Sequence, residues 1–148
     1  MSRATARVAA MQMIYETCAG GEGGEDTLSM VYDELREEQR PLKDGEPTLS
    51  EREWISRVVA GVVGELDDLD ARIGKASQNW SVDRMARVDL AIMRMAVWEL
   101  LHEDDVPGPV VINEAVALAQ RFDSPTAGKF VNGVLSTLLS RRDQEKES

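Results

Sequence analysis

The sequence has little of what most catalytic and metal sites require. Its 148 residues include one cysteine, Cys18, one histidine, His102, and only 5% aromatic side chains. One cysteine cannot form an internal disulfide, which fits a reducing compartment. One Cys with one His cannot build a zinc site of the usual kind. Because Cys18 lies on the apolar stripe of its predicted helix, we interpret it as a small core residue.

Long apolar segments are also absent. The longest run of apolar residues and glycine extends from Val58 to Gly64, which is far too short to span a bilayer. Arg3 and Arg7 interrupt any signal-like apolar core near the start of the chain. We therefore expect a cytoplasmic protein with no membrane partner.

Two patterns resemble enzyme motifs but lack essential parts. Glu99-x-x-His102 is the unit of helical di-iron sites, and such a site needs two of these units. Only a second copy of the chain could supply the second histidine. The simpler interpretation is that Glu99 pairs locally and that His102 lies near a helix C-terminus, where a positive charge is favourable. The stretch over residues 20–24 lacks the Lys-Ser/Thr of a phosphate loop. We predict a protein that is not an enzyme and has no metal site or cofactor.

The charge of the chain is strongly acidic but unevenly distributed. The chain has 17 Lys and Arg residues and 27 Asp and Glu residues, which gives a net charge of −10. The excess lies in residues 20–53, with four basic and eleven acidic side chains, and in residues 54–105, with six and ten. Residues 1–19 carry a net +1, and residues 106–148 are balanced. Such a split indicates two surfaces with different partners.

Apolar residues recur at helical spacing along nearly the whole chain, which predicts an all-α fold. Ser50 to Glu53 form a predicted capping box, with Leu49 as a hydrophobic staple on Trp54. We expect one continuous helix from there to Ile73. Ser81 is predicted to cap a short helix that holds Met85, and a strongly apolar helix follows and ends in Glu103-Asp104-Asp105. The last two helices are predicted to start at Asn113, after an extended lead-in over 110–112, and at Ser124-Pro125. Earlier helices are predicted over 4–19 and 28–35. The predicted domain covers residues 1–140, followed by a charged, disordered tail over 141–148.

Two clusters have the residue types of an RNA-binding surface. The first helix contains side chains that can bind each part of a nucleotide: arginine contacts phosphate, glutamine binds a base edge and tyrosine stacks on an unpaired base. These residues are Arg3, Arg7, Gln12 and Tyr15. Tyr15 fits a core position equally well. In the last helix, Lys129 and Asn132 share a face next to Phe130. Gly133 in the same helix costs about 1 kcal/mol relative to alanine. Close helix packing is the first explanation for this glycine, and room for a ligand is the alternative.

Four segments together resemble one known family. They are Ala9-Ala10-Met11-Gln12-Met13-Ile14-Tyr15, Val88-Asp89-Leu90-Ala91-Ile92-Met93-Arg94-Met95-Ala96-Val97-Trp98-Glu99-Leu100, Ile112-Asn113-Glu114-Ala115-Val116-Ala117-Leu118-Ala119 and Lys129-Phe130-Val131-Asn132-Gly133-Val134-Leu135. In this order and spacing they are similar to the NusB family of bacterial transcription antitermination factors. The resemblance covers nearly all of residues 3–139.

The resemblance implies an all-helical fold of about seven helices in two crossed subdomains of a single domain. It also implies a non-catalytic function: binding the boxA element of nascent ribosomal RNA as a heterodimer with a small-subunit ribosomal protein, NusE, within an antitermination complex on RNA polymerase. The family's RNA contacts correspond here to Arg3, Arg7, Tyr15, Lys129 and Phe130. The N-terminal arginines are sparser than is usual in the family, so we expect weak RNA binding by the chain alone.

A basic partner would suit the acidic middle of the chain. We predict Asp83 and Asp89 as contacts to that partner, although both could simply offset helix dipoles. Two other functions stay open at this stage. The chain could be a NusB-like accessory module of a ribosomal RNA methyltransferase, or a self-associating helical protein, such as a homodimer, with a masked RNA face.

Overall fold

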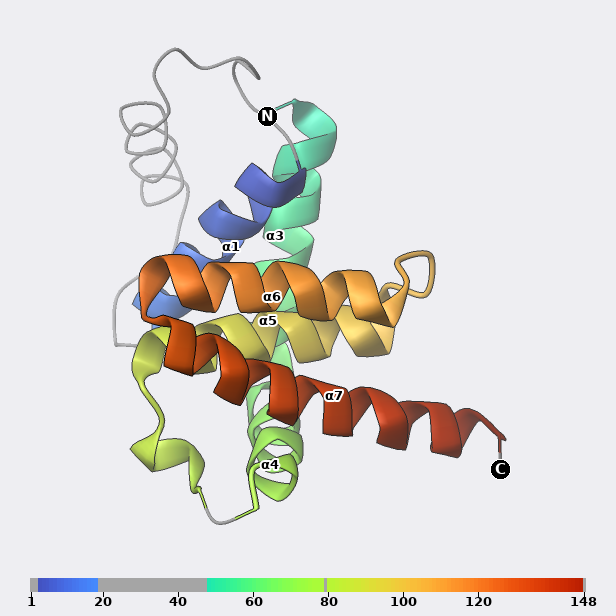
Figure 1. Ribbon diagram of the computed structural model, residues 1–148. Helices are drawn as coiled ribbons and strands as arrows, with labels where there is room; N and C mark the ends of the chain where they lie inside the picture. Colours follow the sequence, from blue (N-terminus) through green and yellow to red (C-terminus); the bar gives the residue numbers. More distant parts are fainter. Residues whose placement is uncertain (1–2, 19–47, 79, 148) are drawn as a thin grey trace. The chain divides into compact units, whose positions relative to one another are not determined.

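The computed structural model describes residues 3–18, 48–78 and 80–147. These residues form six α-helices and one short 3-10 helix, with no strand among them (Figure 1). The elements are α1 (Arg3–Cys18), α3 (Leu49–Gly64), α4 (Leu66–Ala76), η1 (Val82–Arg84), α5 (Arg87–His102), α6 (Gly108–Phe122) and α7 (Pro125–Glu147). The predicted all-α fold is confirmed. The helix predicted over 28–35 lies outside the described residues.

The chain divides into two compact units, residues 1–63 and residues 64–148. The division falls where we predicted one continuous helix, and that prediction is wrong. α3 ends at Gly64, Glu65 leaves helical geometry with φ −117° and ψ 20°, and α4 begins at Leu66. Glycine is a poor helix former and often marks a helix end. The apolar stripe continues across the break, which is why periodicity alone did not detect it.

The first turn of α3 has a different cap from the predicted one. The Thr48 backbone N–H donates to Glu51 Oε1 at 3.1 Å, and the Glu51 backbone N–H donates to Thr48 Oγ1 at 3.1 Å. This reciprocal pair is a capping box built on Thr48 rather than Ser50. Leu49 is 73% exposed and therefore does not act as the predicted staple on Trp54.

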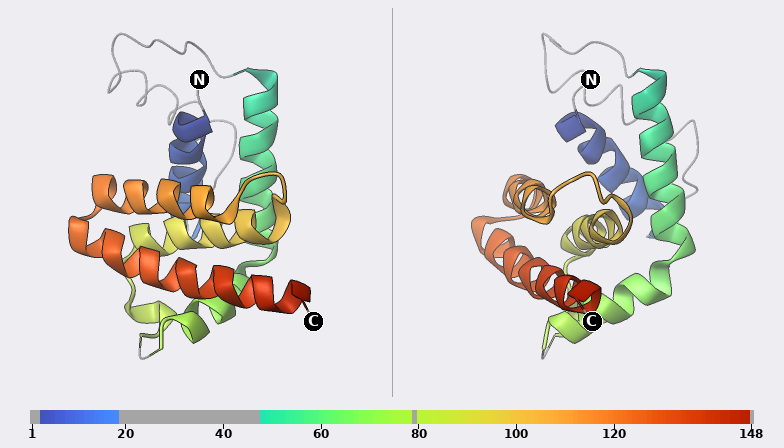
Figure 2. Two further views of the ribbon diagram at one scale, coloured as in Figure 1. Left: turned by 45° about the vertical axis from the view of Figure 1, so that its right-hand side comes forward. Right: turned by 90° about the vertical axis from the view of Figure 1, so that its right-hand side faces the viewer.

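In the second unit, α5 is the central helix. Every residue from Asp89 to Leu100 is buried, and α4, α6 and α7 all contact α5. Figures 1 and 2 show α6 and α7 running alongside it. Apolar side chains on α6 and α7 complete the core; they are Val111, Ile112, Ala115, Leu118, Ala119, Val131, Val134, Leu135 and Leu138. This core holds the ends of α5, α6 and α7 in fixed positions within the unit.

Polar contacts join α4 and the residue before it to α5. The Arg94 guanidinium donates two hydrogen bonds of 2.7 Å to the two carboxylate oxygens of Asp70. Glu65 accepts a hydrogen bond from Trp98 Nε1 at 3.1 Å and lies 2.9 Å from His102 Nε2. His102 lies in the last turn of α5 and pairs with a residue that is far from it in the sequence.

The start of α6 and the end of α7 differ from the predictions. α6 begins at Gly108, so residues 110–112 are helical, and Asn113 is an exposed helical residue rather than a cap. Pro109 in the first turn has a backbone already suited to a helix. α7 continues to Glu147 instead of ending before Arg141. Arg142 donates to the carbonyl oxygen of Leu100 at 3.0 Å, which fastens this predicted tail to α5.

The predicted start of α7 is confirmed. The Ala127 backbone N–H donates to Ser124 Oγ at 3.1 Å, and Pro125 is the first helical residue. A serine cap followed by proline is a favourable start for a helix.

Gly133 is exposed, and a Cβ at this position would have no described atom within 4 Å. Close packing against another described helix is therefore not the explanation, while room for a ligand stays open.

Gly133→Ala is expected to raise the free energy of unfolding by about 1 kcal/mol, because alanine is the better helix former and meets no obstacle. Thermal or urea unfolding measures this change. Gly108→Ala is the matched contrast, because its Cβ would lie 2.5 Å from Leu139 Cδ1. A destabilised Gly133→Ala protein would show that its surface is occupied by something the described residues do not include.

Candidate nucleic-acid interface

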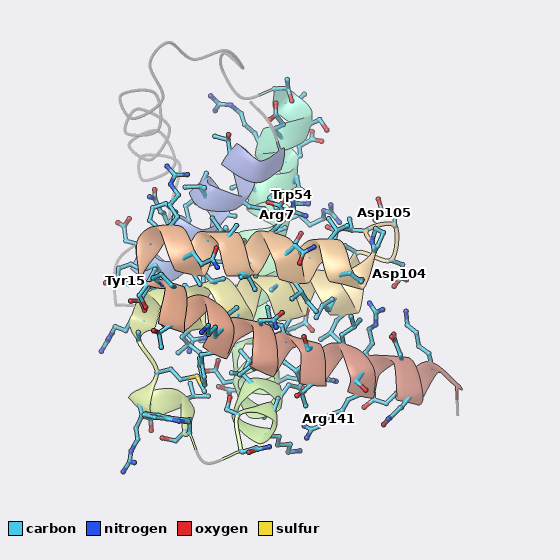
Figure 3. All side chains as sticks on the ribbon, in the orientation of Figure 1. Arg7, Tyr15, Trp54, Asp104, Asp105 and Arg141 are labelled. Atoms are coloured by element: carbon cyan, nitrogen blue, oxygen red, sulfur yellow. The ribbon has the colours of Figure 1, made fainter. Side chains whose placement is uncertain are left out.

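The predicted RNA-binding residues of α1 differ in exposure. Tyr15 is 42% exposed, which favours the surface interpretation over the core one. Gln12 is half-buried, and its Oε1 is buried with no hydrogen-bond partner among the described residues. Arg7 is only 5% exposed, with its guanidinium carbon 5.8 Å from the centre of the Trp54 ring. Figure 3 labels Arg7, Trp54 and Tyr15. The side chain of Arg3 lies outside the described part of the structure.

Burial of Arg7 changes how this residue is interpreted. A guanidinium over an indole ring is a favourable cation–π arrangement. In this structure Arg7 therefore joins α1 to α3 inside the first unit, whereas the sequence alone suggested a phosphate contact at the surface.

The predicted residues of α7 lie near its start. Lys129 and Asn132 are exposed, and Phe130 is half-buried. The Ser124 cap fixes the first turn of α7. Lys129, Phe130 and Asn132 follow it within the next two turns, so the start of the helix sets their positions.

Phe130 lines an open pocket of about 370 Å³ in the second unit, a volume in the usual range for small-ligand sites. We call it the aromatic pocket. It lies where the segment before α5, the start of α5, the α6–α7 junction and the start of α7 meet. Its lining includes Trp80, Arg84, Asp89, Asp123, Ser124 and Phe130. Trp80 is 53% exposed, so a large aromatic surface is available to a ligand there.

Asp89 is the unusual polar group of the aromatic pocket. It is 6% exposed, and its Oδ1 has no hydrogen-bond partner among the described residues. Burial first, and then the hydrogen bond and negative charge of Asp123, together raise the pKa of Asp89 to about 7. Near neutral pH Asp89 is therefore about half-protonated, so the pocket is less negative than its two carboxyl groups suggest.

The raised pKa of Asp89 makes stability depend on pH. Because the folded-state pKa lies above the unfolded one, Asp89 favours folding most below about pH 4, and this contribution is lost as the pH rises to about 7. Asp89→Asn stays neutral throughout. We expect its melting temperature to exceed that of the natural chain at about pH 8, by an amount equivalent to about 1–3 kcal/mol. The difference should shrink towards about pH 5. Calorimetry at both pH values measures it, and equal differences at the two would contradict a raised pKa.

The two residues predicted to contact a basic partner are not equivalent. Asp83 in η1 is exposed, as such a contact requires. Asp89 is buried in the aromatic pocket, so its carboxyl group is not available to a flat protein surface. We therefore revise the interpretation of Asp89 from a partner contact to a pocket residue.

Sequence reasoning did not identify Trp80, Arg84 and Asp123 as site residues. Trp80 does carry a signal: it is a large aromatic residue in a helix break, where a core role is less expected. Arg84 and Asp123 carry none, because only the packing of α5 against the α6–α7 junction brings them together.

The Glu99-x-x-His102 pattern does not form a metal site with the residues that the structure describes. Glu99 is 2% exposed, and His102 is paired with Glu65. Within residues 3–18, 48–78 and 80–147, no group of three or more His, Cys, Asp or Glu is arranged to hold a metal ion. In the same residues, no helix combines the length and apolar character needed to cross a membrane.

The helical fold and the open aromatic pocket define an all-α protein whose candidate site suits binding. The chain belongs to the NusB family, whose family model matches residues 4–140. It is 38% identical to the transcription antitermination protein NusB of Sorangium cellulosum, over 98% of this chain and 99% of that protein.

Two solved structures are similar over nearly the whole chain. NusB of T. maritima superposes with a TM-score of 0.78 and 28% identity, covering 95% of this chain and 92% of that one. A chain from a crystal structure of antitermination factors NusB and NusE in complex with dsRNA has a TM-score of 0.76 and 27% identity. That match covers 94% of this chain and 96% of the other.

Proposed function

We propose that this protein is a non-catalytic transcription antitermination factor that binds boxA RNA of nascent ribosomal transcripts together with the basic ribosomal protein NusE. It acts in the cytoplasm within an antitermination complex on RNA polymerase. The observation that carries the proposal is the match of residues 4–140 to the NusB family. The similar structure of NusB and NusE with dsRNA supports both partners.

The RNA-binding residues of this proposal come from both ends of the chain. They are Arg3, Gln12 and Tyr15 of α1 and Lys129, Phe130 and Asn132 of α7. Tyr15 offers an exposed ring and Phe130 lines the aromatic pocket, as stacking on unpaired bases requires. Arg7 belongs to α1 as well, where it lies buried over Trp54 and packs α1 against α3 within the first unit.

The NusE-binding part of the proposal rests on charge. Residues 20–105 contain all of the acidic excess of the chain. Complementary charge speeds association with a basic protein and selects for it. Within this stretch, the exposed Asp83 is the proposed contact.

Filter binding of labelled boxA RNA and of a scrambled RNA of equal composition tests this function. The full chain is titrated alone and with equimolar NusE, at one stated salt concentration. We expect weak binding by the chain alone and binding to boxA RNA at least about tenfold tighter with NusE. Equal affinity for boxA and scrambled RNA, or no gain from NusE, would overturn the proposal. Sedimentation of the free chain shows whether a homodimer masks the RNA surface instead.

A further inference from the structure

A second pocket of the second unit lies at the other end of α5 from the aromatic pocket. α5 contributes Val97, Leu100 and Leu101 to its lining, and the other lining residues come from α4 and α7. Its volume is about 240 Å³, which is below the range of about 300–1,000 Å³ that is usual for small-molecule sites. The pocket therefore suits a side chain or a short polypeptide segment better than a whole cofactor. We call it the basic pocket.

The two outer helices turn one face each towards the basic pocket. On α4 the lining residues recur at positions i, i+3, i+4 and i+7 from Asp68 to Lys75, and on α7 they do so from Leu138 to Glu145. This spacing places the four residues of each helix on one side of it. The pocket thus lies between two helix faces beside α5, which is the setting in which proteins bind an amphipathic segment of a partner.

Positive charge dominates the lining of the basic pocket, although the whole chain has a net charge of −10. Four basic side chains line it, against two acidic ones, Asp68 and Glu145. Two of the four basic side chains already have a partner. Arg72 forms a 3.0 Å ion pair with Asp68, and Arg142 lies 2.9 Å from Asp143. These pairs fix the edges of the pocket without removing its excess of positive charge.

The other two basic side chains, Lys75 and Arg141, are available to a ligand. Both are exposed, and within the described part of the chain neither has a hydrogen bond or an ion pair. They lie on opposite sides of the pocket, because Lys75 belongs to α4 and Arg141, which Figure 3 labels, belongs to α7. Charges act over about 8 Å at physiological ionic strength. A ligand in the pocket therefore interacts with these two cations more strongly than with the net charge of the chain.

We propose that the basic pocket is a docking site for an acidic segment of a partner protein. The segment places an aliphatic side chain against the α5 residues and its carboxylates beside Lys75 and Arg141. An apolar anchor surrounded by charged contacts is a common arrangement in protein interfaces, and a guanidinium can bind a carboxylate through two parallel hydrogen bonds. The expected partner is acidic and therefore chemically distinct from the basic NusE.

The lining of the basic pocket favours a protein over RNA as its ligand. No aromatic side chain is among the described residues that line it, whereas single-stranded nucleic acid is usually held by stacking of bases on aromatic rings. Phosphates alone would need the cations but not the aliphatic side chains of α5. The basic pocket shares no residue with the aromatic pocket, so this inference does not depend on the proposed RNA-binding function.

A fluorescein-labelled peptide of about 15 residues, with leucine at helical spacing and glutamate elsewhere, is the probe. Fluorescence anisotropy measures its binding to the full chain at about 0.15 M salt. Two matched peptides separate the contributions: one has alanine in place of every leucine, and the other has glutamine in place of every glutamate. We expect each to bind at least about tenfold more weakly than the probe, because each lacks one half of the proposed contact.

Arg141→Glu tests the location of the site. Because Arg141 is exposed and has no partner in the described residues, we expect the variant to fold normally and to bind the probe at least about tenfold more weakly. Lys75→Glu should have a similar effect from the α4 side. Arg87→Glu is the matched control, since it makes the same charge change at an exposed position at the opposite end of α5. It should bind the probe like the natural chain, and circular dichroism checks that all three variants are folded.

The possible results separate a protein site from a general anion site. The inference is overturned if the probe does not bind, if the alanine peptide binds as tightly as the probe, or if Arg87→Glu weakens binding as much as Arg141→Glu does. An oligouridine of the same net charge as the probe is the nucleic-acid control. Binding of this RNA as tight as that of the probe, with an equal loss in Arg141→Glu, would also overturn it. None of these results depends on whether boxA RNA binds.

Discussion

Arg94→Ala is expected to lower the free energy of unfolding by about 2–4 kcal/mol, because it breaks a largely buried ion pair. The guanidinium of Arg94 makes two 2.7 Å hydrogen bonds with Asp70 and joins α5 to α4. The Arg94 side chain is 11% exposed and that of Asp70 24%. Alanine leaves the Asp70 carboxylate without its partner in a partly desolvated position. The expected value is somewhat below that of a fully buried pair, because water still reaches Asp70.

The chain offers a matched control for this prediction. Arg72 forms a 3.0 Å ion pair with Asp68 on the surface of α4, with side chains 37% and 57% exposed. Arg72→Ala should cost only about 0.5 kcal/mol or less, because solvent screens exposed pairs. Urea unfolding monitored by circular dichroism measures both variants. Similar losses for Arg72→Ala and Arg94→Ala would show that the Arg94–Asp70 contact does not carry the stability assigned to it.

Phe130→Leu is expected to weaken binding of boxA RNA to the chain–NusE complex by about tenfold or more. Loss of one base–aromatic stacking contact costs about 1–3 kcal/mol, and about 1.4 kcal/mol corresponds to tenfold in affinity. Leucine keeps an apolar side chain at the half-buried position, so the core of the second unit stays filled. Filter binding at fixed salt concentration gives the affinity.

Phe130→Tyr is the conservative partner of this variant, since it restores a ring able to stack. We expect it to bind boxA RNA nearly as well as the natural chain. Circular dichroism and the melting temperature establish that both variants are folded. If folded Phe130→Leu binds RNA as tightly as Phe130→Tyr does, Phe130 is a packing residue and not an RNA contact.

Local signals in the sequence predicted where α5, α6 and α7 lie better than where these helices begin and end. The apolar spacing in residues 88–100 and the Ser124-Pro125 start describe the buried α5 and the start of α7 correctly, because these features act within a few residues. The errors arise where two local signals compete. Thr48 and Ser50 are both suitable caps, and only the structure shows that Glu51 pairs with Thr48. Similarly, the apolar stripe outweighed Gly64 in the prediction of one long helix.

The candidate site was only partly predictable, for a different reason. Phe130 and Asp89 are 41 positions apart, and their common pocket depends on how α5 and α7 pack. No pattern within the sequence places Trp80 or Asp123 beside them. The residue type of Arg7 suggested a phosphate contact, and only the structure shows that its guanidinium also lies over the Trp54 ring. Motifs thus indicated the function, while packing determined the chemistry of the pocket.

Ultraviolet cross-linking of boxA RNA to the chain–NusE complex, with mass spectrometry of the modified peptides, tests the central claim most directly. RNA binding at the proposed residues of each unit predicts cross-links at Tyr15 in the first unit and at Trp80 and Phe130 in the second. Cross-links only within NusE, or only near Arg141 of α7 (labelled in Figure 3), would contradict it.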